Sequence, residues 1–461
     1  MLCPFSFASL SAPMKLRIAV LTVIALAGHA QSVMAATVAK SSTCGVTESQ
    51  LARIRELNAD VVKRGFAPGI TSLIFCEGRP LLTVAQGVSS TGRDMTPDTL
   101  FRVYSMTKPL TSLAAMILVD AGEIQLDEPI AKYLPAFSMP TVIDNGVAAT
   151  ELKTVAATRA PTIRDLLRHS AGITYSSKDT DPVHRMYTQK GIDNGAGSKV
   201  VPTDNSPPIA SSEELANRIA AVPMLCQPGE CFRYGNATDV LGRVIEKLSG
   251  KRLGAFMQER IFDPLKMNDS FFVVPADKVS RLSAAYVAKS KSSKPNTILH
   301  AYPLDQLGEG GTFQIEDPKA SIFASPRYMD FGGAGLVTSA ADYQRFLQLM
   351  LNGGTLDGVT LISPESVAAM TQNQLDRKAL DASSLDKQGL GFGLGFSIFL
   401  EPGKTPVAVP KDGYFWGGAA STYMWADPAR RITGVVMAQV FGGDVMPFYL
   451  EMLNTIYASA K

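Results

Sequence analysis

The stretch RVYSMTKPLTSLAAMIL, residues 102–118, places a serine and a lysine at the start of a long apolar segment. From Leu110 onwards, apolar residues recur with the spacing of one helix face, and the other faces are also mostly apolar, which predicts a helix buried on all sides. Ser105 and Lys108 are three positions apart and therefore share a face of that helix. Because a charged amine is costly in apolar surroundings, the sequence raises the question of what Lys108 does there.

A lysine beside a serine can activate the hydroxyl group for nucleophilic attack. An alcohol is a poor nucleophile, and a lysine can act as its base when burial and neighbouring groups favour the neutral amine. The pattern alone is weak, because SLDK at residues 384–387 also matches it, in a polar stretch with no apolar helix after it. We interpret that second copy as a solvated loop. The alternative for Ser105 and Lys108 is a helix cap followed by a lysine that extends to the solvent.

Two further motifs supply groups that such a site requires. Tyr234-Gly-Asn236 is the only Tyr-x-Asn sequence in the chain, and it comes just before a helical stretch. A tyrosine near a lysine can share a proton with it, and an asparagine can hold the lysine and a substrate carbonyl group. FWGGAAS, residues 415–421, is predicted to open a strand, and its two glycines would allow a substrate to lie against that strand. The alternative for the Tyr-x-Asn motif is a turn built around Gly235.

Short strands are predicted at both ends of the chain, with mainly helical sequence between them. GITSLIF and PLLTVAQG indicate a hairpin near the N-terminus, and FGLGFSIFL, AASTYMWAD and ITGVVMAQVF indicate strands near the C-terminus. Hairpin-linked strands pair antiparallel, so the simplest assembly joins both ends into one sheet covered by helices. The predicted class is α+β, with an α/β lobe at about residues 49–115 and 330–461 and a helical lobe at about residues 116–329.

Taken together, the motifs resemble those of the serine β-lactamase and penicillin-binding protein superfamily. Ser-x-x-Lys, Tyr-x-Asn and a small-residue strand motif follow one another in the order of that superfamily, and TIRDLLRHSAGITY and GGAGLVTSAADYQRFLQLMLNGG are also similar to its segments. The nearest pattern is that of class C β-lactamases and family VIII carboxylesterases. The resemblance covers about residues 48–457 and implies a class C β-lactamase-like fold, an antiparallel sheet flanked by helices beside a mainly helical lobe.

The resemblance implies a role for each motif residue. Ser105 would be the acylated nucleophile, and Lys108 and Tyr234 would be the general base and acid. Asn236 would orient the lysine and the substrate. The backbone N–H groups of the nucleophile and of Ala419 would form the oxyanion hole.

The strand motif departs from the β-lactamase pattern. β-Lactamases carry Lys-Thr-Gly or a close variant, whose lysine helps to hold the substrate carboxylate. The aligned residues here are Trp416, Gly417 and Gly418, as in family VIII esterases. KDG at residues 411–413 is an alternative register, but it lacks the small-residue strand after it. The sequence contains no Gly-x-Ser-x-Gly, which argues against an α/β-hydrolase nucleophile elbow.

Residues 1–35 are predicted to be a secretory signal peptide. Lys15 and Arg17 precede an apolar run too short to span a bilayer and a small-residue cleavage pattern that ends at Ala35. The alternative is a buried N-terminal helix. Residues 36–48 then form a polar linker. The two leader cations account for the formal net charge of +2, so the mature chain is formally neutral and nothing favours nucleic acid. We expect a periplasmic or secreted protein without a further membrane span.

The cysteines remaining after leader removal permit two disulfides in an exported protein. They are Cys44, Cys76, Cys226 and Cys231. The Pro-Gly turn in CQPGEC predicts that Cys226 pairs with Cys231, with four free buried thiols as the alternative. The scattered cysteines and histidines do not form a metal-ligand pattern, so no metal or cofactor is expected. His169 is expected to satisfy hydrogen bonds behind the helical lobe.

The sequence therefore predicts an exported serine hydrolase that acts through an acyl-enzyme, most simply a carboxylesterase on small esters. Three alternatives use the same residues: a class C-like β-lactamase, a peptidase or amidase for small or D-amino-acid peptides, and a penicillin-binding sensor that acylates without turnover. The expected partner is a small-molecule ester, amide or peptide substrate.

Overall fold

A computed structural model describes residues 44–144, 152–176, 182–192, 207–289, 304, 307–442 and 445–458. They belong to one compact unit, Ser42–Lys461. The predicted signal peptide and residues 36–43 of the predicted linker lie outside the described residues and stay predictions.

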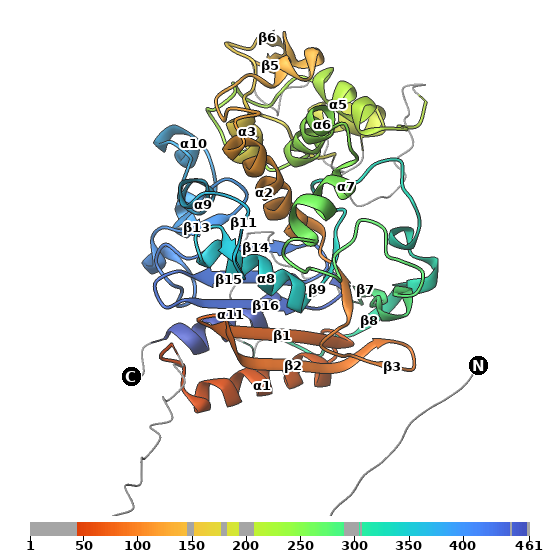
Figure 1. The fold of residues 1–461 in the computed structure, drawn as a ribbon, viewed down its shortest axis with the longest axis vertical. Helices are drawn as coiled ribbons and strands as arrows, with labels where there is room; N and C mark the ends of the chain where they lie inside the picture. Colours follow the sequence, from red (N-terminus) through yellow and green to blue (C-terminus); the bar gives the residue numbers. More distant parts are fainter. Residues whose placement is uncertain are drawn as a thin grey trace, which may run out of the picture. The chain divides into compact units, whose positions relative to one another are not determined.

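Eight strands form one antiparallel sheet that joins the two ends of the domain (Figure 1). In sequence order they are β1 (Gly69–Cys76), β2 (Arg79–Ser90), β3 (Arg93–Asp94), β12 (Leu390–Phe392), β13 (Ser397–Phe399), β14 (Tyr414–Gly418), β15 (Thr422–Asp427) and β16 (Ile432–Met437). Their order across the sheet is β12-β13-β14-β15-β16-β1-β2-β3, and Thr71 of β1 pairs with Met437 of β16. The predicted α+β class and the predicted union of both chain ends are confirmed.

Helices cover both faces of this sheet. They are α1 (Glu48–Lys63), α8 (Ala340–Leu351) and α11 (Met446–Tyr457). The rings of Tyr423 and Trp425 in β15 contact the ring of Tyr449 in α11. Thr433, whose strand partner is Ala426, projects to the opposite face and accepts a hydrogen bond from Gln348 of α8. The inner strands of the sheet are therefore buried between helices, as their apolar composition requires.

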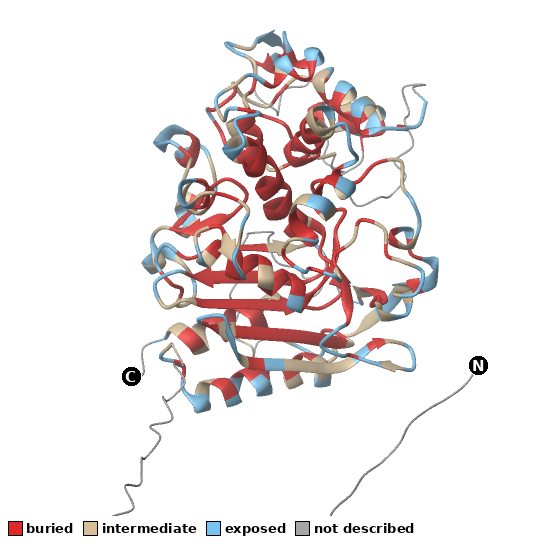
Figure 2. Ribbon diagram, in the orientation of Figure 1, coloured by how far each residue is buried: buried red, intermediate tan, exposed pale blue. Residues whose placement is uncertain are grey.

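The middle of the chain supplies the helices that stand beside the sheet. They are α2 (Thr107–Asp120), α3 (Ile163–Leu167), α4 (Pro182–Gln189), α5 (Ser212–Ala220), α6 (Ala237–Ser249) and α7 (Leu253–Met257). Figure 2 shows α2 buried along almost its whole length. The same region also contains β5 (Thr141–Ile143), β6 (Thr154–Ala156), β7 (Ala285–Ala288) and β8 (Thr312–Glu316), so it is less uniformly helical than predicted. The lobe boundaries stay a prediction.

The C-terminal strands differ from the prediction in two places. FGLGFSIFL contributes to two strands, because the chain turns back at residues 393–396. There the N–H of Gly393 donates to the carbonyl oxygen of Phe396 at 2.8 Å, and Gly395 has a φ of +108°. Trp416 and the two glycines after it end β14 rather than open a strand, and β15 begins only at Thr422. Between these strands Ser421 has a φ of +62°, the left-handed conformation of a tight turn.

The structure contains both disulfides that four cysteines permit. Cys226 is joined to Cys231, the predicted pair. Cys44 is joined to Cys76, which answers the connectivity that the sequence left open. This second bridge ties the chain before α1 to the end of β1.

Candidate active site

Ser105 lies in a 3₁₀ turn, Tyr104–Met106, immediately before α2. Tyr104 has a φ of +43°, so the backbone takes a left-handed conformation one residue before the serine. Ser105 is partly exposed, whereas the rest of residues 101–118 is buried. The cap position of α2 is occupied by Met106. The alternative in which Ser105 serves as a helix cap is therefore wrong, and capping does not occupy its hydroxyl group.

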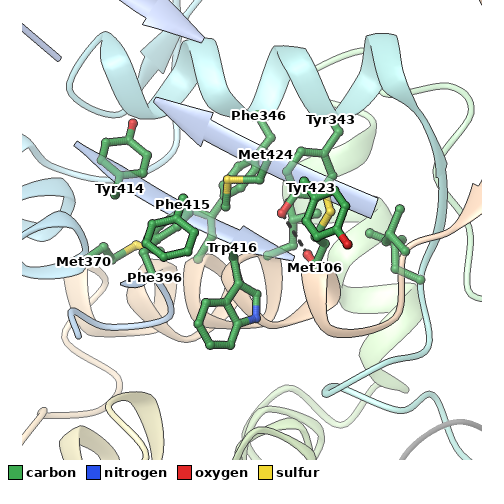
Figure 3. Packing of buried hydrophobic residues seen from close by; sticks show 14 of the residues in the cluster. Met106, Tyr343, Phe346, Met370, Phe396, Tyr414, Phe415, Trp416, Tyr423 and Met424 are labelled. Atoms are coloured by element: carbon green, nitrogen blue, oxygen red, sulfur yellow. Dashed lines mark hydrogen bonds between the residues drawn. The ribbon is translucent and has the colours of Figure 1, made fainter. Parts of the chain in front are cut away.

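Contacts from α8 and β14 hold this turn in place. The hydroxyl of Tyr343 in α8 donates to the carbonyl oxygen of Met106 at 2.9 Å (Figure 3). A Cβ on Gly418, at the end of β14, would lie only 2.2 Å from the carbonyl oxygen of Val103. Only glycine allows the strand to approach the turn so closely. The predicted strand motif and the predicted nucleophile are thus brought together by a backbone contact.

The amino group of Lys108 is buried and surrounded by three oxygen atoms. The residue is 1% exposed. Its Nζ lies 2.7 Å from the carbonyl oxygen of Gly333, 2.9 Å from the hydroxyl of Tyr175 and 3.4 Å from Oγ of Ser105. An ammonium group has three N–H donors, which match these three acceptors. The alternative in which Lys108 extends to the solvent is therefore wrong. Its Nζ instead lies where it can exchange a proton with Ser105.

Tyr175 is a site residue that no motif predicted. Its hydroxyl group accepts the hydrogen bond from Lys108, and Nζ lies 5.6 Å from the centre of its ring. Tyr175 is the last residue of TIRDLLRHSAGITY, a segment that carried part of the family resemblance without a role for any residue in it. Its place in that segment is the sequence feature from which Tyr175 could have been proposed as a site residue.

Tyr234 approaches Lys108 with its ring rather than with its hydroxyl group. Nζ of Lys108 lies 4.7 Å from the centre of the Tyr234 ring, a cation–π distance. The hydroxyl group is buried and has no hydrogen-bond partner within the described residues. The predicted proton-sharing contact between Tyr234 and Lys108 is made here by Tyr175 instead. The Tyr234 hydroxyl remains beside the site as an unused hydrogen-bonding group.

The segment of Tyr175 and the segment of Tyr234 run side by side. The N–H of Asn236 donates to the carbonyl oxygen of Thr174 at 3.3 Å. A Cβ on Gly235 would lie 2.4 Å from the carbonyl carbon of Thr174, so only glycine fits between the two named residues of the Tyr-x-Asn motif. The glycine of this motif therefore brings two tyrosines to one site.

His169 lies behind Tyr234 as a buried, uncharged ring. The two ring centres are 4.7 Å apart. Burial, together with the positive charge of Lys108, holds the pKa of His169 well below its ordinary value. Nδ1 has no hydrogen-bond partner in the part of the chain that the structure describes. The expectation that His169 satisfies hydrogen bonds is therefore wrong for this atom, and its main contact is ring packing.

Asn236 and Asp239 stand at the start of α6, close to Lys108. Asn236 is fully buried at the cap position, and its Nδ2 donates to Oδ2 of Asp239 at 3.1 Å. Oδ1 of Asp239 accepts a hydrogen bond from the N–H of Gly333 at 2.9 Å. Burial raises the pKa of the Asp239 carboxyl, and the charge of Lys108 and the N–H donors oppose that rise. No motif pointed to Asp239, which is simply an acidic residue in the first turn of α6.

Trp416 forms an aromatic wall beside Tyr234. Its ring centre is 5.3 Å from that of Tyr234 and 5.3 Å from that of Phe392. Figure 3 shows the indole pointing away from Tyr343 and Phe346 of α8. Its Nε1 is buried without a hydrogen-bond partner among the described residues. An uncharged ring therefore stands at the residue that the sequence resemblance aligned with the β-lactamase lysine.

The end of β14 leaves one strand edge available. β13 pairs with β14 only at Tyr414 and Phe415. Residues 416–418 pair with β15 and, among the described strands, with no other. Ala419 follows in an exposed turn. Backbone groups at this edge can bind an extended substrate, as the two glycines predicted.

The competing sequence motifs lie at the surface. Ser384 and Lys387 are both exposed, which agrees with their interpretation as a solvated loop. Lys411 is exposed in the turn before β14, whereas Gly418 reaches the turn of Ser105. The tryptophan register is therefore the one that meets the turn of Ser105.

The described residues contain neither a cluster of three or more metal-ligating side chains nor a helix long and apolar enough to cross a bilayer.

Comparisons with known proteins cover nearly the whole domain. The Beta-lactamase family model matches residues 54–455. Protein Rv1367c of Mycobacterium tuberculosis (strain ATCC 25618 / H37Rv) is 31% identical over 354 residues, 76% of this chain and 79% of that protein. Esterase EstB of Burkholderia gladioli is 27% identical over 397 residues, 85% of this chain and 91% of the esterase. Among solved structures, EstCE1, a hydrolase with promiscuous acyltransferase activity, shares the fold with a TM-score of 0.69 at 24% identity, covering 89% of this chain and 99% of its own.

Proposed function

This chain belongs to the Beta-lactamase family and is a serine hydrolase, and from that premise we propose that it hydrolyses small carboxylic esters through an acyl-enzyme on Ser105. One arrangement carries the proposal. Lys108 is buried with its Nζ 3.4 Å from Oγ of the serine, and the site is bordered by the uncharged indole of Trp416. The lysine supports an activated nucleophile, and the indole favours an uncharged acyl group.

The reaction begins when Oγ of Ser105 attacks the carbonyl carbon of the ester. As the new bond forms, the hydroxyl proton passes to the group made by Lys108, Tyr175 and Tyr234. The tetrahedral intermediate then collapses, and the bond to the alkoxy oxygen breaks. The departing oxygen takes the proton and leaves as the alcohol. Water adds to the acyl carbon with the same group as base, which releases the carboxylic acid and the free serine.

The oxyanion of the intermediate is assigned to two backbone N–H groups, those of Ser105 and Ala419. The support is the contact between Gly418 and Val103, which brings the end of β14 against the turn that carries the nucleophile. Removal of one such donor typically raises the barrier by about 3 kcal/mol. Asn236, at the cap of α6, is proposed to orient the substrate carbonyl group.

Trp416 is the basis for preferring esters to β-lactams. The carboxylate of a β-lactam would lack a charge-assisted partner at this position, a loss of about 1.5–3 kcal/mol. An ester with an uncharged acyl group loses nothing there, and the rings of Trp416, Tyr234 and Phe392 offer it an apolar wall.

Export is the second part of the proposal. Its support is the predicted signal peptide, together with two disulfides, which persist in oxidising compartments. Sequencing of the protein from the periplasmic fraction or medium should place the mature N-terminus after Ala35. Accumulation of the uncleaved chain in the cytoplasm would contradict export.

A substrate panel on the purified protein tests the reaction. The panel contains p-nitrophenyl esters, a chromogenic cephalosporin and amino-acid p-nitroanilides. We expect kcat/KM for the best short-chain ester to exceed that for the cephalosporin by about tenfold or more. A cephalosporin value equal to that of the ester would instead favour a class C-like β-lactamase, and anilide cleavage would favour a peptidase or amidase. An acyl-enzyme that persists for hours would favour a penicillin-binding sensor.

A further inference from the structure

The double glycine at residues 332–333 forms a backbone bridge between α2 and α6. On the α2 side, the carbonyl oxygen of Gly332 accepts a hydrogen bond from Thr111 Oγ1 at 2.8 Å, and that of Gly333 accepts one from Lys108 Nζ at 2.7 Å. On the α6 side, the N–H of Gly333 donates to Oδ1 of Asp239 at 2.9 Å. A single residue, Gly333, therefore contacts both the buried lysine and the buried carboxylate.

Neither glycine has room for a side chain. A Cβ on Gly332 would lie 2.6 Å from the carbonyl oxygen of Thr238, and a Cβ on Gly333 would lie 2.8 Å from Oδ2 of Asp239. The bridge is thus pressed against the first turn of α6. The position of the Asp239 carboxylate consequently determines the position of the Gly333 carbonyl group, which holds Lys108.

Asp239 is a buried acid whose surroundings compensate a negative charge. It is 1% exposed, and it accepts hydrogen bonds from Gly333 and from Asn236. A buried carboxylate requires such donors and a positive charge nearby, and Lys108 supplies that charge. The other titratable groups that face Lys108 are the phenol groups of Tyr175 and Tyr234 and the ring of His169.

We propose that Asp239 is a positioning residue for Lys108, an inference that rests on the proposed chemistry at Ser105. Its carboxylate fixes Gly333, whose carbonyl group holds the lysine within reach of the serine. Its negative charge also balances the ammonium charge that forms and disappears with each proton transfer. Asp239 acts through Lys108 and Gly333.

A second buried aspartate separates this role from simple stabilisation of a helix. Asp239 is the third residue of α6, and Asp342 is the third residue of α8. Asp342 is 7% exposed and accepts a hydrogen bond from the N–H of Asp269 at 2.7 Å. Its charged neighbours are Asp269 and Arg345 rather than Lys108. Asp342→Asn is therefore a matched control for Asp239→Asn.

The experiment measures two rates as functions of pH in the full chain: labelling of Ser105 by a fluorophosphonate and hydrolysis of a p-nitrophenyl ester. Asp239→Asn should slow both about 10- to 100-fold, with the loss in kcat rather than in KM. The acid limb of both pH–rate profiles should move to lower pH, because the site loses a negative charge. Asp342→Asn should keep both rates within about twofold of wild type, with the acid limb in place.

Two outcomes would overturn the proposal: Asp239→Asn with the wild-type acid limb and rates, or Asp342→Asn with an equal loss. Gly333→Ala covers the case in which Asp239→Asn does not fold. It keeps both charges and displaces Gly333 from Asp239, so labelling should slow while the acid limb stays in place. Gly403→Ala is its control, because a Cβ on Gly403 has no atom within 4 Å. A wild-type labelling rate in Gly333→Ala would also overturn the proposal.

Labelling does not require ester turnover, so the two proposals can fail separately. A wild-type protein that is labelled at Ser105 but hydrolyses no ester contradicts the proposed substrate class and leaves the Asp239 test valid. A wild-type protein that is not labelled at Ser105 overturns both.

Discussion

The chain contains two Ser-x-x-Lys sequences whose surroundings are opposite. Lys108 is 1% exposed and has three oxygen atoms around its Nζ. Ser384 and Lys387 are both exposed, in a region that also carries the surface ion pair between Arg377 and Asp381. Water stabilises the charge of an exposed lysine, whereas the same charge is costly in a buried position unless partners compensate it. The Ser-x-x-Lys spacing alone therefore does not predict a reactive serine. The lysine must also be buried beside it.

The largest difference in kcat/KM is expected between alanine variants of Ser105 and Ser384. Ser105→Ala should lower kcat/KM for the best ester by at least about 10³-fold, because no nucleophile remains at the turn. Ser384→Ala should leave kcat/KM unchanged. Peptide mapping by mass spectrometry after phosphonate treatment should locate the adduct on Ser105. An adduct on Ser384 would reverse the comparison.

The next largest difference in kcat/KM is expected between alanine variants of Lys108 and Lys387. Lys108→Ala should lower kcat/KM by about 10²- to 10⁴-fold, the contribution of a general acid–base group. Lys387→Ala should have no effect on it, since its side chain is exposed. Equal kcat/KM values for the two variants would show that burial is not what distinguishes the copies.

Variants of Tyr234 and Tyr175 test the contributions of the two tyrosines beside Lys108. Tyr234→Phe should lower kcat by about 10²-fold or more while leaving Tm unchanged or raising it, because the lost hydroxyl is buried without a partner among the described residues. Tyr175→Phe should lower both kcat and Tm, since it removes an acceptor of Lys108. Combining Lys108→Ala with Tyr234→Phe should cost little more than the poorer single change. Full activity in Tyr234→Phe would remove its proposed role.

Trp416→Lys should change selectivity more than rate. A cation at this wall restores a partner for a carboxylate, so the ratio of cephalosporin to ester kcat/KM should rise by about ten- to a hundredfold. Lys411→Ala is the control, because Lys411 is exposed before β14 and should leave the ratio unchanged. If Lys411→Ala is the variant that alters cephalosporin turnover, the strand register assigned here is wrong.

The disulfides should affect stability more than catalysis. Cys226 and Cys231 are 5 positions apart, and Cys44 and Cys76 are 32 apart. Loop closure predicts losses in the free energy of unfolding of about 2 kcal/mol for Cys226→Ser and about 4 kcal/mol for Cys44→Ser. Urea titration of each variant checks this order. A larger loss of unfolding free energy for Cys226→Ser than for Cys44→Ser would mean that loop closure alone does not explain the contribution of the short disulfide loop.

The parts of the fold that were predictable from sequence are those that short-range patterns encode. The apolar spacing after Ser105 predicted α2, and short β-rich runs predicted the strands. Ser339 caps α8, and its side chain accepts the N–H of Asp342, as expected of a serine just before a helix. The tight turns at Gly395 and Ser421 were missed, because a positive φ has no periodic signature.

The parts of the site that were not predictable depend on contacts between distant segments. Lys108 and Gly333 are 225 residues apart, and the acceptor is a backbone oxygen whose position no side-chain pattern records. Asp239 enters the site only through that contact. The family resemblance supplied Tyr234, but which hydroxyl group lies against Lys108 depends on how two loops pack, and the structure gives Tyr175 that contact.

Because β1 pairs with β16, the central sheet cannot be completed until nearly the whole chain has been synthesised. A nascent chain that has produced α2 still lacks β14, whose Gly418 packs on the turn of Ser105. During that interval β1 presents an open edge that another chain could pair with. Contacts between such distant segments form late in folding. An unfinished chain therefore carries Ser105 and Lys108 without the strand that packs on the Ser105 turn.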